Sequence, residues 1–423
     1  MKVSVPYGEA ALSCEIPDDR LKGVLHSRAH SFKAKASEAQ LAREALNSPV
    51  GSPPLRDLAK GKKHVVVITS DHTRPVPSHV TMPLLLEEIR AGNPDADVTI
   101  LAATGMHRHM AQGEIAARFG LEVSSSEKIV VHDCHDNANM VSLGTLPSGG
   151  ELVLNRLAAE CDLLISEGFI EPHFFAGFSG GRKAVLPGVA GYRTVLANHC
   201  AEFIAHEQAR TGILDGNPIH KDMIFAAKAA KLAFILNVLL DADKKIIAAF
   251  AGNADEAHRR GCDFLNGLAG IDPVPAEIVI TGNGGYPLDQ NLYQAVKGMT
   301  GAEASILPGG VIVMAAECRD GHGGEAFYDT FKETRSAEDL MRAILARKRG
   351  ETLPDQWQTQ IFLRVLLKHK VVMVASVPPE MIEHLGMIPA PSLDAALKKA
   401  EEILGRSSAS VTVIPDGVSV IIR

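Results

Sequence analysis

The chain has 423 residues, of which 22% are charged and 46% hydrophobic, and a formal net charge of −7 at pH 7. The length predicts two domains, the composition is that of a globular protein, and the lack of a basic surplus argues against a nucleic-acid partner. No apolar run approaches the roughly 18 residues of a membrane span, and the N-terminus lacks the apolar core of a signal peptide. The six cysteines form no Cys-x-x-Cys pair, which argues against a disulfide framework and a zinc knuckle, so we expect a cytoplasmic protein.

Strand-like apolar runs alternate with helix-length segments in the first part of the chain. The predicted strands cover residues 64–69, 98–103, 129–132, 162–166 and 232–240, and helices are predicted over 82–91 and 110–119. Alternation of this kind is typical of a mostly parallel sheet covered by helices. An N-terminal α/β domain is therefore predicted over residues 1–268.

The pattern restarts after residues 266–275, a Gly-, Asp- and Pro-rich stretch that we interpret as a linker. Further strands over 277–280, 311–315 and 371–375 predict a C-terminal α/β domain at 276–423. Residues 411–423 resemble two strands around a Pro-Asp-Gly turn, and packing of these strands back on the N-terminal domain stays open. The expected fold is α/β, with two Rossmann-like domains, mostly parallel sheets and an active site in the cleft between them.

Unusual polar residues follow four of the predicted strands. They occupy residues 70–77, 104–108, 167–183 and 281–291, which carry His, Arg, Lys, Asp and Gly. Open α/β sheets bind ligands beyond the carboxyl ends of their strands. These four loops therefore predict a binding or catalytic site.

Residues 171–188 combine His173, Lys183 and four glycines in a single loop. Glycine allows a backbone to approach a ligand closely, and a lysine there neutralises phosphate or attacks an electrophile. The loop is not a nucleotide-binding P-loop, because Arg182 replaces the second glycine and Ala184 replaces the hydroxyl residue. It is interpreted as a phosphate-friendly loop, and His173 and Lys183 are its candidate functional residues.

Three further candidates each have a structural alternative. Arg74 lies in a proline-stiffened loop suited to carboxylate binding, but it could form a surface ion pair with Asp71. His107 could hydrogen-bond a helix start, and a lone histidine such as His199 is more often structural than a ligand.

Tyr293, Gln294 and Lys297 are predicted to share one edge of a helix that begins after Asp289. The alternative for this edge is a solvated helix face. Taken together, the candidates provide two histidines for proton transfer and cations for an anionic substrate. A single histidine cannot hold a transition metal unaided, so a cofactor or substrate would have to supply the other ligands.

Five segments resemble the nickel-dependent lactate racemases, and the resemblance extends over essentially the whole chain. The segments are Ser70-Asp-His-Thr-Arg-Pro-Val-Pro77, Ala103-Thr-Gly-Met-His-Arg108, Ser166-Glu-Gly-Phe-Ile-Glu-Pro-His-Phe-Phe-Ala-Gly-Phe-Ser-Gly-Gly-Arg-Lys183, Ala197-Asn-His199 and Gly284-Gly-Tyr-Pro-Leu-Asp-Gln-Asn-Leu-Tyr-Gln-Ala-Val-Lys-Gly298. Segments this long in this order are a specific signature.

This resemblance implies a nickel-pincer nucleotide, a pyridinium mononucleotide with two thio-acid arms. It implies a thioamide link from Lys183, a nickel ligand at His199 and acid/base roles for His107 and His173. The implied cofactor contacts are Asp71, His72, Thr73, Arg74, Gly180 and Gly181. The implied substrate contacts are Arg74, Tyr293, Gln294, Lys297 and Trp357.

The predicted function is interconversion of D- and L-lactate, or of a closely related short 2-hydroxy acid, by hydride transfer through a 2-keto acid. The expected partners are this substrate and the cofactor-biosynthesis proteins of the host, and the oligomeric state is not predicted. A racemase of a larger 2-hydroxy acid remains an alternative. An NAD-dependent 2-hydroxy-acid dehydrogenase is a second, although no Gly-x-Gly-x-x-Gly opens a helix after a strand. A non-catalytic carboxylate-binding module would not need the paired histidines, and a sulfur-cofactor biosynthesis protein should show reactive cysteine pairs.

Overall fold

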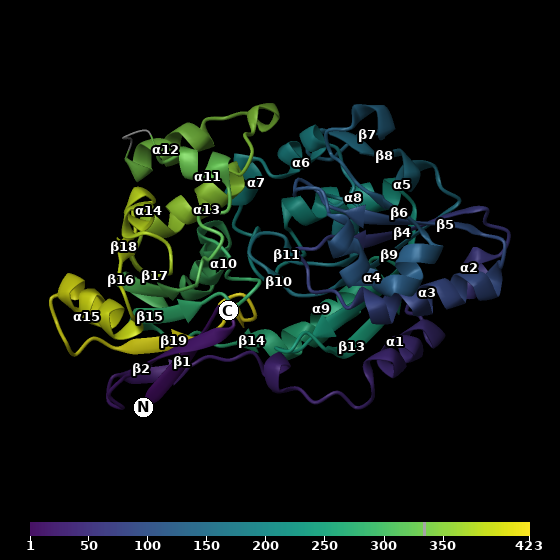
Figure 1. Cartoon of the computed structure of the whole chain (residues 1–423). Helices are drawn as coiled ribbons and strands as arrows, with labels where there is room; N and C mark the ends of the chain where they lie inside the picture. Colours follow the sequence, from purple (N-terminus) through teal and green to yellow (C-terminus); the bar gives the residue numbers. More distant parts are fainter. Residues whose placement is uncertain (333–335) are drawn as a thin grey trace. The chain divides into compact units, whose positions relative to one another are not determined.

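The computed structural model describes residues 1–332 and 336–423, which form two compact units (Figure 1). The N-terminal unit comprises residues 28–199 and 206–268. The C-terminal unit comprises residues 1–27, 200–205 and 269–423. Each unit is built around a six-stranded sheet.

The sheet of the N-terminal unit has the strand order β13-β12-β9-β4-β5-β6. All neighbours pair in parallel except β13, which is antiparallel to β12. Numbered along the chain, the strands follow the order 3-2-1-4-5-6 of the doubly wound fold, whose switch point lies between β4 and β9. The strands are β4 (His64–Ser70), β5 (Asp97–Ala103), β6 (Lys128–Val131), β9 (Leu163–Phe169), β12 (Leu232–Leu240) and β13 (Ile246–Gly252).

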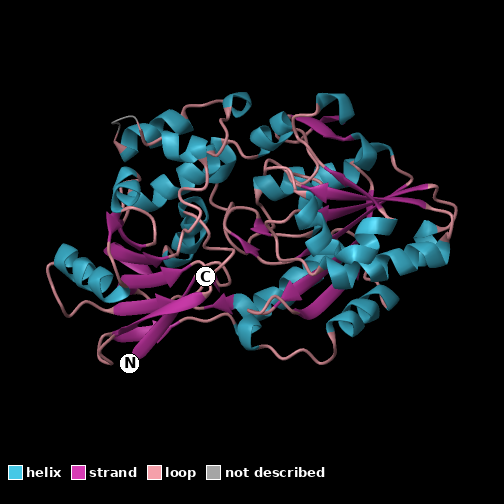
Figure 2. Cartoon of the chain, viewed as in Figure 1, coloured by secondary structure: helices cyan, strands magenta, loops and turns pink. Residues whose placement is uncertain are grey.

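Helices cover both faces of this sheet, with α1 to α4 on one face and α5 and α8 on the other (Figures 1 and 2). Buried residues of α1 to α4 pack against alternate strand residues such as Val65, Val67 and Ile165. The long helices are α1 (Glu38–Asn47), α3 (Ser78–Gly92), α4 (Gln112–Ser126), α8 (Pro218–Ala229) and α9 (Glu256–Ala269). The shorter elements are η1 (Arg28–Ser31), α2 (Leu55–Ala59), η2 (Asn137–Asn139), β7 (Met140–Thr145), β8 (Glu151–Asn155), α5 (Arg156–Glu160), β10 (Pro172–His173), β11 (Gly177–Phe178), η3 (Gly181–Ala184) and α6 (Tyr192–Asn198).

The sheet of the C-terminal unit has the order β18-β17-β16-β15-β19-β3, and every pair is parallel. Its strands are β3 (Leu21–Val24), β15 (Ala276–Gly282), β16 (Ile306–Ala315), β17 (Lys370–Val374), β18 (Ile388–Pro389) and β19 (Val411–Ile414). Its helices are α7 (Ala201–Ala205), α10 (Leu292–Ala302), α11 (Glu325–Asp329), α12 (Ala337–Leu345), η4 (Arg349–Glu351), α13 (Gln356–Leu366), α14 (Pro379–His384) and α15 (Leu393–Leu404). Two small sheets complete the unit: β1 (Lys2–Tyr7) with β2 (Ala10–Glu15), and β14 (Gly270–Ile271) with β20 (Ile421–Ile422).

The α/β class and the mostly parallel sheets are confirmed, and three details differ from the prediction. The expected linker at 266–275 begins later, because α9 continues to Ala269 and β14 follows it. The two terminal strands exist but do not pair with each other, because β19 joins β15 and β3 while β20 joins β14. Both terminal strands lie in the C-terminal unit. Residues 1–27 also belong to this unit, whereas the prediction placed them in the N-terminal domain at 1–268.

None of the described helices is long and apolar enough to cross a lipid bilayer.

Candidate active site

Two of the predicted loops leave the sheet of the N-terminal unit at its switch point. Residues 71–77 follow β4, and residues 170–183 follow the neighbouring strand β9. A third loop, at 104–111, follows β5, which pairs with β4 on its other side. It is tied to the Gly-rich segment, because the Gly105 amide donates to Gly188 O at 3.0 Å and the Gly188 amide donates to Lys183 O at 3.1 Å. The topology therefore brings these three loops to one end of one sheet.

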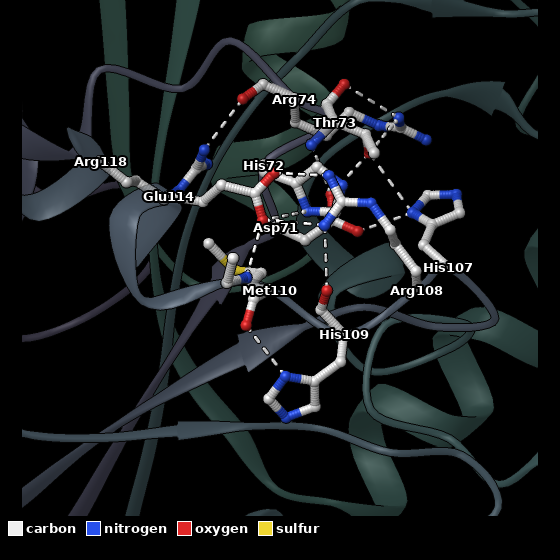
Figure 3. A network of polar contacts seen from close by, with 11 residues as sticks. Asp71, His72, Thr73, Arg74, His107, Arg108, His109, Met110, Glu114 and Arg118 are labelled. Carbon is white, nitrogen blue, oxygen red and sulfur yellow. Dashed lines mark hydrogen bonds and ion pairs between the residues drawn. The ribbon is translucent and has the colours of Figure 1, made fainter. Parts of the chain in front are cut away.

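Asp71 is the centre of the first cluster of site residues (Figure 3). It is only 1% exposed, and its Oδ2 lies 2.6 Å from His107 Nδ1. Its Oδ1 accepts hydrogen bonds from the backbone N–H and the hydroxyl of Thr73. Burial alone raises the pKa of Asp71, but the hydrogen bond and charge of His107, with the charge of Arg74, hold it well below its usual value. An ionised Asp71 keeps the proton of a neutral His107 on Nδ1, so Nε2 is the basic nitrogen.

Arg74 extends this cluster. Its Nη1 donates to the Thr73 hydroxyl at 2.9 Å, and its carbonyl accepts from Arg118 Nη1 at 3.0 Å. Among the described residues, only Nη1 of the Arg74 guanidinium makes a hydrogen bond within the protein. The other N–H groups can therefore bind an anion. The alternative considered for Arg74, a surface ion pair with Asp71, is replaced by an indirect link through the Thr73 hydroxyl.

His72 and Arg108 both lie near Glu114 in this cluster (Figure 3). Arg108 forms a two-pronged ion pair with Glu114, and this hydrogen bond lowers the pKa of Glu114 to about 2. His72 Nδ1 lies 3.9 Å from Glu114 Oε2, and burial lowers the pKa of His72.

A second cluster surrounds the ring of Phe175, which is 4% exposed. The ring of His173 lies 4.6 Å from it and the ring of His199 lies 5.1 Å from it, both edge to face. Lys183 Nζ lies 5.9 Å from the centre of the same ring. Three residues that are up to 26 positions apart in the sequence (199 minus 173) therefore meet around one aromatic side chain.

His199 ends α6, and its imidazole is 5% exposed. Burial, and then the positive charge of Lys183, lower the pKa of His199 to about 3. The side chain is therefore neutral at physiological pH, which is the form that binds metal ions. His173 is part of the short hairpin formed by β10 and β11, in which it pairs with Gly177.

Gly180 and Gly181 have packing reasons to be glycine. Both have positive φ, of +76° and +52°. A Cβ at Gly180 would lie 2.7 Å from Asn237 Oδ1, and one at Gly181 would lie 2.7 Å from His258 Cγ. Both glycines therefore allow the backbone to pack closely against neighbouring side chains. Contact of either glycine with a cofactor stays a prediction.

The four site residues predicted in the C-terminal unit occupy two helices. Tyr293, Gln294 and Lys297 are all half-buried on α10, which begins after the N-cap Asn291, two residues later than the predicted start after Asp289. Trp357 is 8% exposed on α13, and the neighbouring Gln358 side chain donates to the carbonyl of Tyr293. These contacts place Trp357 and Tyr293 on adjoining helices of one unit.

Two charged residues that support the loops, one buried and one half-buried, were not predicted from the sequence. Glu167 is 2% exposed in β9 and accepts hydrogen bonds of 2.5 Å from the hydroxyls of Thr69, Ser78 and Thr81. Arg118 supports the carbonyl of Arg74. Glu167 could have been found from the sequence, because it is a glutamate in an otherwise apolar strand. No sequence pattern in α4 distinguishes Arg118.

Buried neutral histidines make the stability of this unit sensitive to acid. Burial is the main cause that lowers the pKa of His132 to about 4, that of His220 to about 3 and that of His258 well below 6.5. The unfolded chain takes up protons at these histidines below about pH 6.5, whereas the folded chain does not. We therefore expect the free energy of unfolding to fall between pH 6.5 and pH 4 by up to about 1.4 kcal/mol per pH unit for each histidine.

Urea unfolding at pH 7.5, 6.0 and 5.0 measures this effect. His206→Gln, which changes an exposed histidine, should leave the dependence of the unfolding free energy on pH unchanged. An unfolding free energy that is constant over this range would contradict the neutral state of the buried histidines.

Comparison with known proteins gives a consistent result over the full length. Residues 7–212 match the family model described as "Lactate racemase N-terminal domain", and residues 271–422 match "Lactate racemase C-terminal domain". Proteins named lactate racemase from Thermoanaerobacterium thermosaccharolyticum and Lactiplantibacillus plantarum are 56% and 49% identical over 422 residues, which is 100% of this chain and 99% of each relative.

Solved structures agree with these matches. The lactate racemase apoprotein from T. thermosaccharolyticum has a TM-score of 0.96 and 54% identity, with both chains covered completely. A protein from Thermotoga maritima has a TM-score of 0.68 at 18% identity and covers 93% of this chain, which shows the shared fold alone.

Proposed function

Because the chain belongs to the lactate racemase family and is therefore an isomerase, we propose that it interconverts D- and L-lactate through a 2-keto acid, with a nickel-pincer nucleotide linked to Lys183. Removing the C2 hydrogen of lactate as a proton is difficult, because the neighbouring group is a carboxylate rather than a ketone. Removing it as a hydride gives a planar 2-keto acid, which can take the hydride back on either face. When bound, the cofactor supplies the hydride acceptor.

The observation that carries this proposal is the cluster around Phe175. It holds a lysine suited to covalent attachment, a buried neutral imidazole and a second histidine within reach of one ring. Among the described residues there is no group of three or more His, Cys, Asp or Glu side chains that could hold a metal ion. The donor set therefore fits a metal that arrives with its own ligands and takes only one, His199, from the protein.

His107 and His173 are proposed as the two acid/base groups, one for each enantiomer. The Asp71 carboxylate holds the Nδ1 proton of His107, which leaves Nε2 to accept the 2-hydroxyl proton and to return it later. Asp71 also stabilises the imidazolium that forms in between. His173 is proposed to do the same for the mirror-image substrate.

Arg74 is proposed to anchor the substrate carboxylate through the N–H groups that it does not use within the protein. Thr73 fixes the orientation of the guanidinium, and Arg118 fixes the backbone of the loop. Lys297, Gln294, Tyr293 and Trp357 remain proposed substrate contacts, as Asp71, His72, Thr73, Gly180 and Gly181 remain proposed cofactor contacts. The predicted placement of the site in a cleft between the domains stays a prediction. A cytoplasmic location and the host's cofactor-biosynthesis proteins as partners are part of the same proposal.

The test is racemisation of each pure lactate enantiomer by protein from a host that makes the cofactor, followed by chiral chromatography. Both directions should approach an equal mixture. Parallel assays with a larger 2-hydroxy acid, such as 2-hydroxyisocaproate, test the main alternative. Faster turnover of that acid than of lactate would shift the substrate assignment, and NAD-dependent formation of pyruvate would replace the proposal with a dehydrogenase.

His199→Ala should lose bound nickel while the covalent adduct at Lys183 persists, because attachment and metal binding depend on different residues. Metal analysis and intact-mass spectrometry of the same sample measure the two quantities. His206→Ala is the matched control, since it removes an exposed histidine that follows the same segment. Full nickel content in His199→Ala would exclude His199 as the metal ligand.

A further inference from the structure

The side chain of Arg182 is one of the largest that are fully buried in this protein, and the proposed chemistry does not use it. In the sequence it is the residue that breaks the P-loop pattern, immediately before Lys183. It would be expected to point toward an anionic ligand if the loop bound phosphate through it. Its 0% exposure shows that it points into the protein instead.

The guanidinium of Arg182 binds the hairpin that carries His173. Its Nη2 donates to Ala176 O at 2.7 Å, and its Nη1 donates to Phe178 O at 2.8 Å. These two carbonyls flank Gly177, which is the partner of His173 in the β10–β11 pair. The planar fork of an arginine can hold two carbonyls in a fixed relation, which a lysine cannot do.

A neutral histidine holds the guanidinium through its Nε, which donates to His220 Nδ1 at 3.0 Å. His258 lies beside it, with Nε2 3.1 Å from Arg182 Nη1, and donates from this nitrogen to Ser179 O at 2.8 Å. Within the described part of the chain no carboxylate hydrogen-bonds to Arg182. Burial lowers the pKa of Arg182 to about 10, so the side chain stays charged at neutral pH. A buried cation without a paired carboxylate is costly, and the surrounding backbone carbonyls offset this cost by accepting its N–H groups.

Two further hydrogen bonds fix the position of the hairpin. The Asn217 side chain donates to Phe175 O at 2.8 Å, and the Gly212 amide donates to Gly177 O at 2.9 Å. A Cβ at Gly177 would lie 2.2 Å from Ile213 O, so the backbone there is tightly enclosed. Asn217 and the segment around Gly212 fix one side of the hairpin, and Arg182 fixes the carbonyls on the side of the Gly-rich segment.

We propose that Arg182 is a positioning residue, which holds the β10–β11 hairpin so that His173 is correctly placed for proton transfer. This inference rests on the proposed acid/base role of His173. It predicts that the effect of Arg182 is transmitted through His173 and not through His107, whose position depends on Asp71 and a different loop. A general effect on folding would act on both histidines alike.

The test is a pair of double-mutant cycles measured on the cofactor-loaded enzyme. Arg182→Gln should lower kcat by on the order of 10²-fold, because a displaced catalytic group costs about that much. In the His173→Ala background the same change should have less than about a twofold further effect, whereas in the His107→Ala background the full loss should remain. Arg182→Lys keeps the charge without the planar fork, so its loss of kcat should also disappear in the His173→Ala background and remain in the His107→Ala background. This variant replaces Arg182→Gln if the latter fails to fold. Arg43→Gln, which changes an exposed arginine paired with Glu87, is the control and should match the wild type.

Two readouts do not depend on activity. Hydrogen exchange should become faster in residues 172–178 of Arg182→Gln and stay unchanged in residues 71–77, and intact mass should show the Lys183 adduct as before. Equal losses in both histidine backgrounds, or loss of the adduct, would overturn the positioning role while leaving the proposed function intact. If His173→Ala itself retained near-native rates, the proposed acid/base role of His173 would fail, and the positioning role of Arg182 would fail with it.

Discussion

Lys183→Ala should abolish both the covalent adduct and all racemisation above background. The side chain amine is the only group proposed to attach the cofactor, and it lies against the ring of Phe175 beside His173 and His199. Intact-mass spectrometry should show the unmodified chain, and metal analysis should show nickel well below one equivalent.

The matched control for this change is Lys221→Ala, which removes an exposed lysine of α8 in the same unit. It should keep the adduct, the nickel and the activity. An unmodified, nickel-free Lys183→Ala protein that racemises lactate at the native rate would be incompatible with the proposed cofactor.

His107→Ala and His173→Ala should each lose on the order of 10²–10⁴-fold in the rate of racemisation, because each removes one acid/base group. Nickel and the Lys183 adduct should remain bound in both variants, since neither histidine is proposed to hold the cofactor. Rates measured from each enantiomer separately, with metal analysis of the same preparations, give the result.

Asp71→Asn provides a finer check on His107, because it removes the charge that stabilises the imidazolium but keeps the shape of the side chain. The racemisation rate of Asp71→Asn should lie between the rates of the wild type and His107→Ala. His79→Ala, an exposed histidine near the start of α3, should behave as the wild type does. Near-native rates in both directions for either proposed acid/base variant would remove that histidine from the mechanism.

Much of the fold was predictable because the strands of the N-terminal unit are buried on both faces. The run at 232–240 matches β12 residue for residue, and the run at 64–69 matches β4 within one residue. Two of the strands that were missed, β3 and β14, depend on non-local pairing. β3 joins its sheet by pairing with β19, and β14 pairs with β20, about 150 residues later in the chain (421 minus 270). No local pattern encodes such partners.

Several of the candidate site residues were proposed from their positions after strands, and the sheet order shows what these positions share. β4, β5 and β9 are adjacent, so their loops meet at one end of the sheet. The residues that support the site were harder to predict, since Arg182 was noticed only as a departure from a P-loop. Its role depends on the carbonyls of Ala176 and Phe178 and on His220, far along the chain. Such contacts follow from tertiary packing and leave no periodic trace in the sequence.

The most direct test of the central claim follows the C2 hydrogen of lactate during racemisation. Lactate deuterated at C2 is converted in ordinary water, and the inverted product from the first turnovers is analysed by mass spectrometry. Transfer as a hydride within the site predicts a primary isotope effect and retention of most of the deuterium in the product. Complete loss of deuterium to water during the first turnovers would contradict hydride transfer and would favour a racemase that works by proton abstraction.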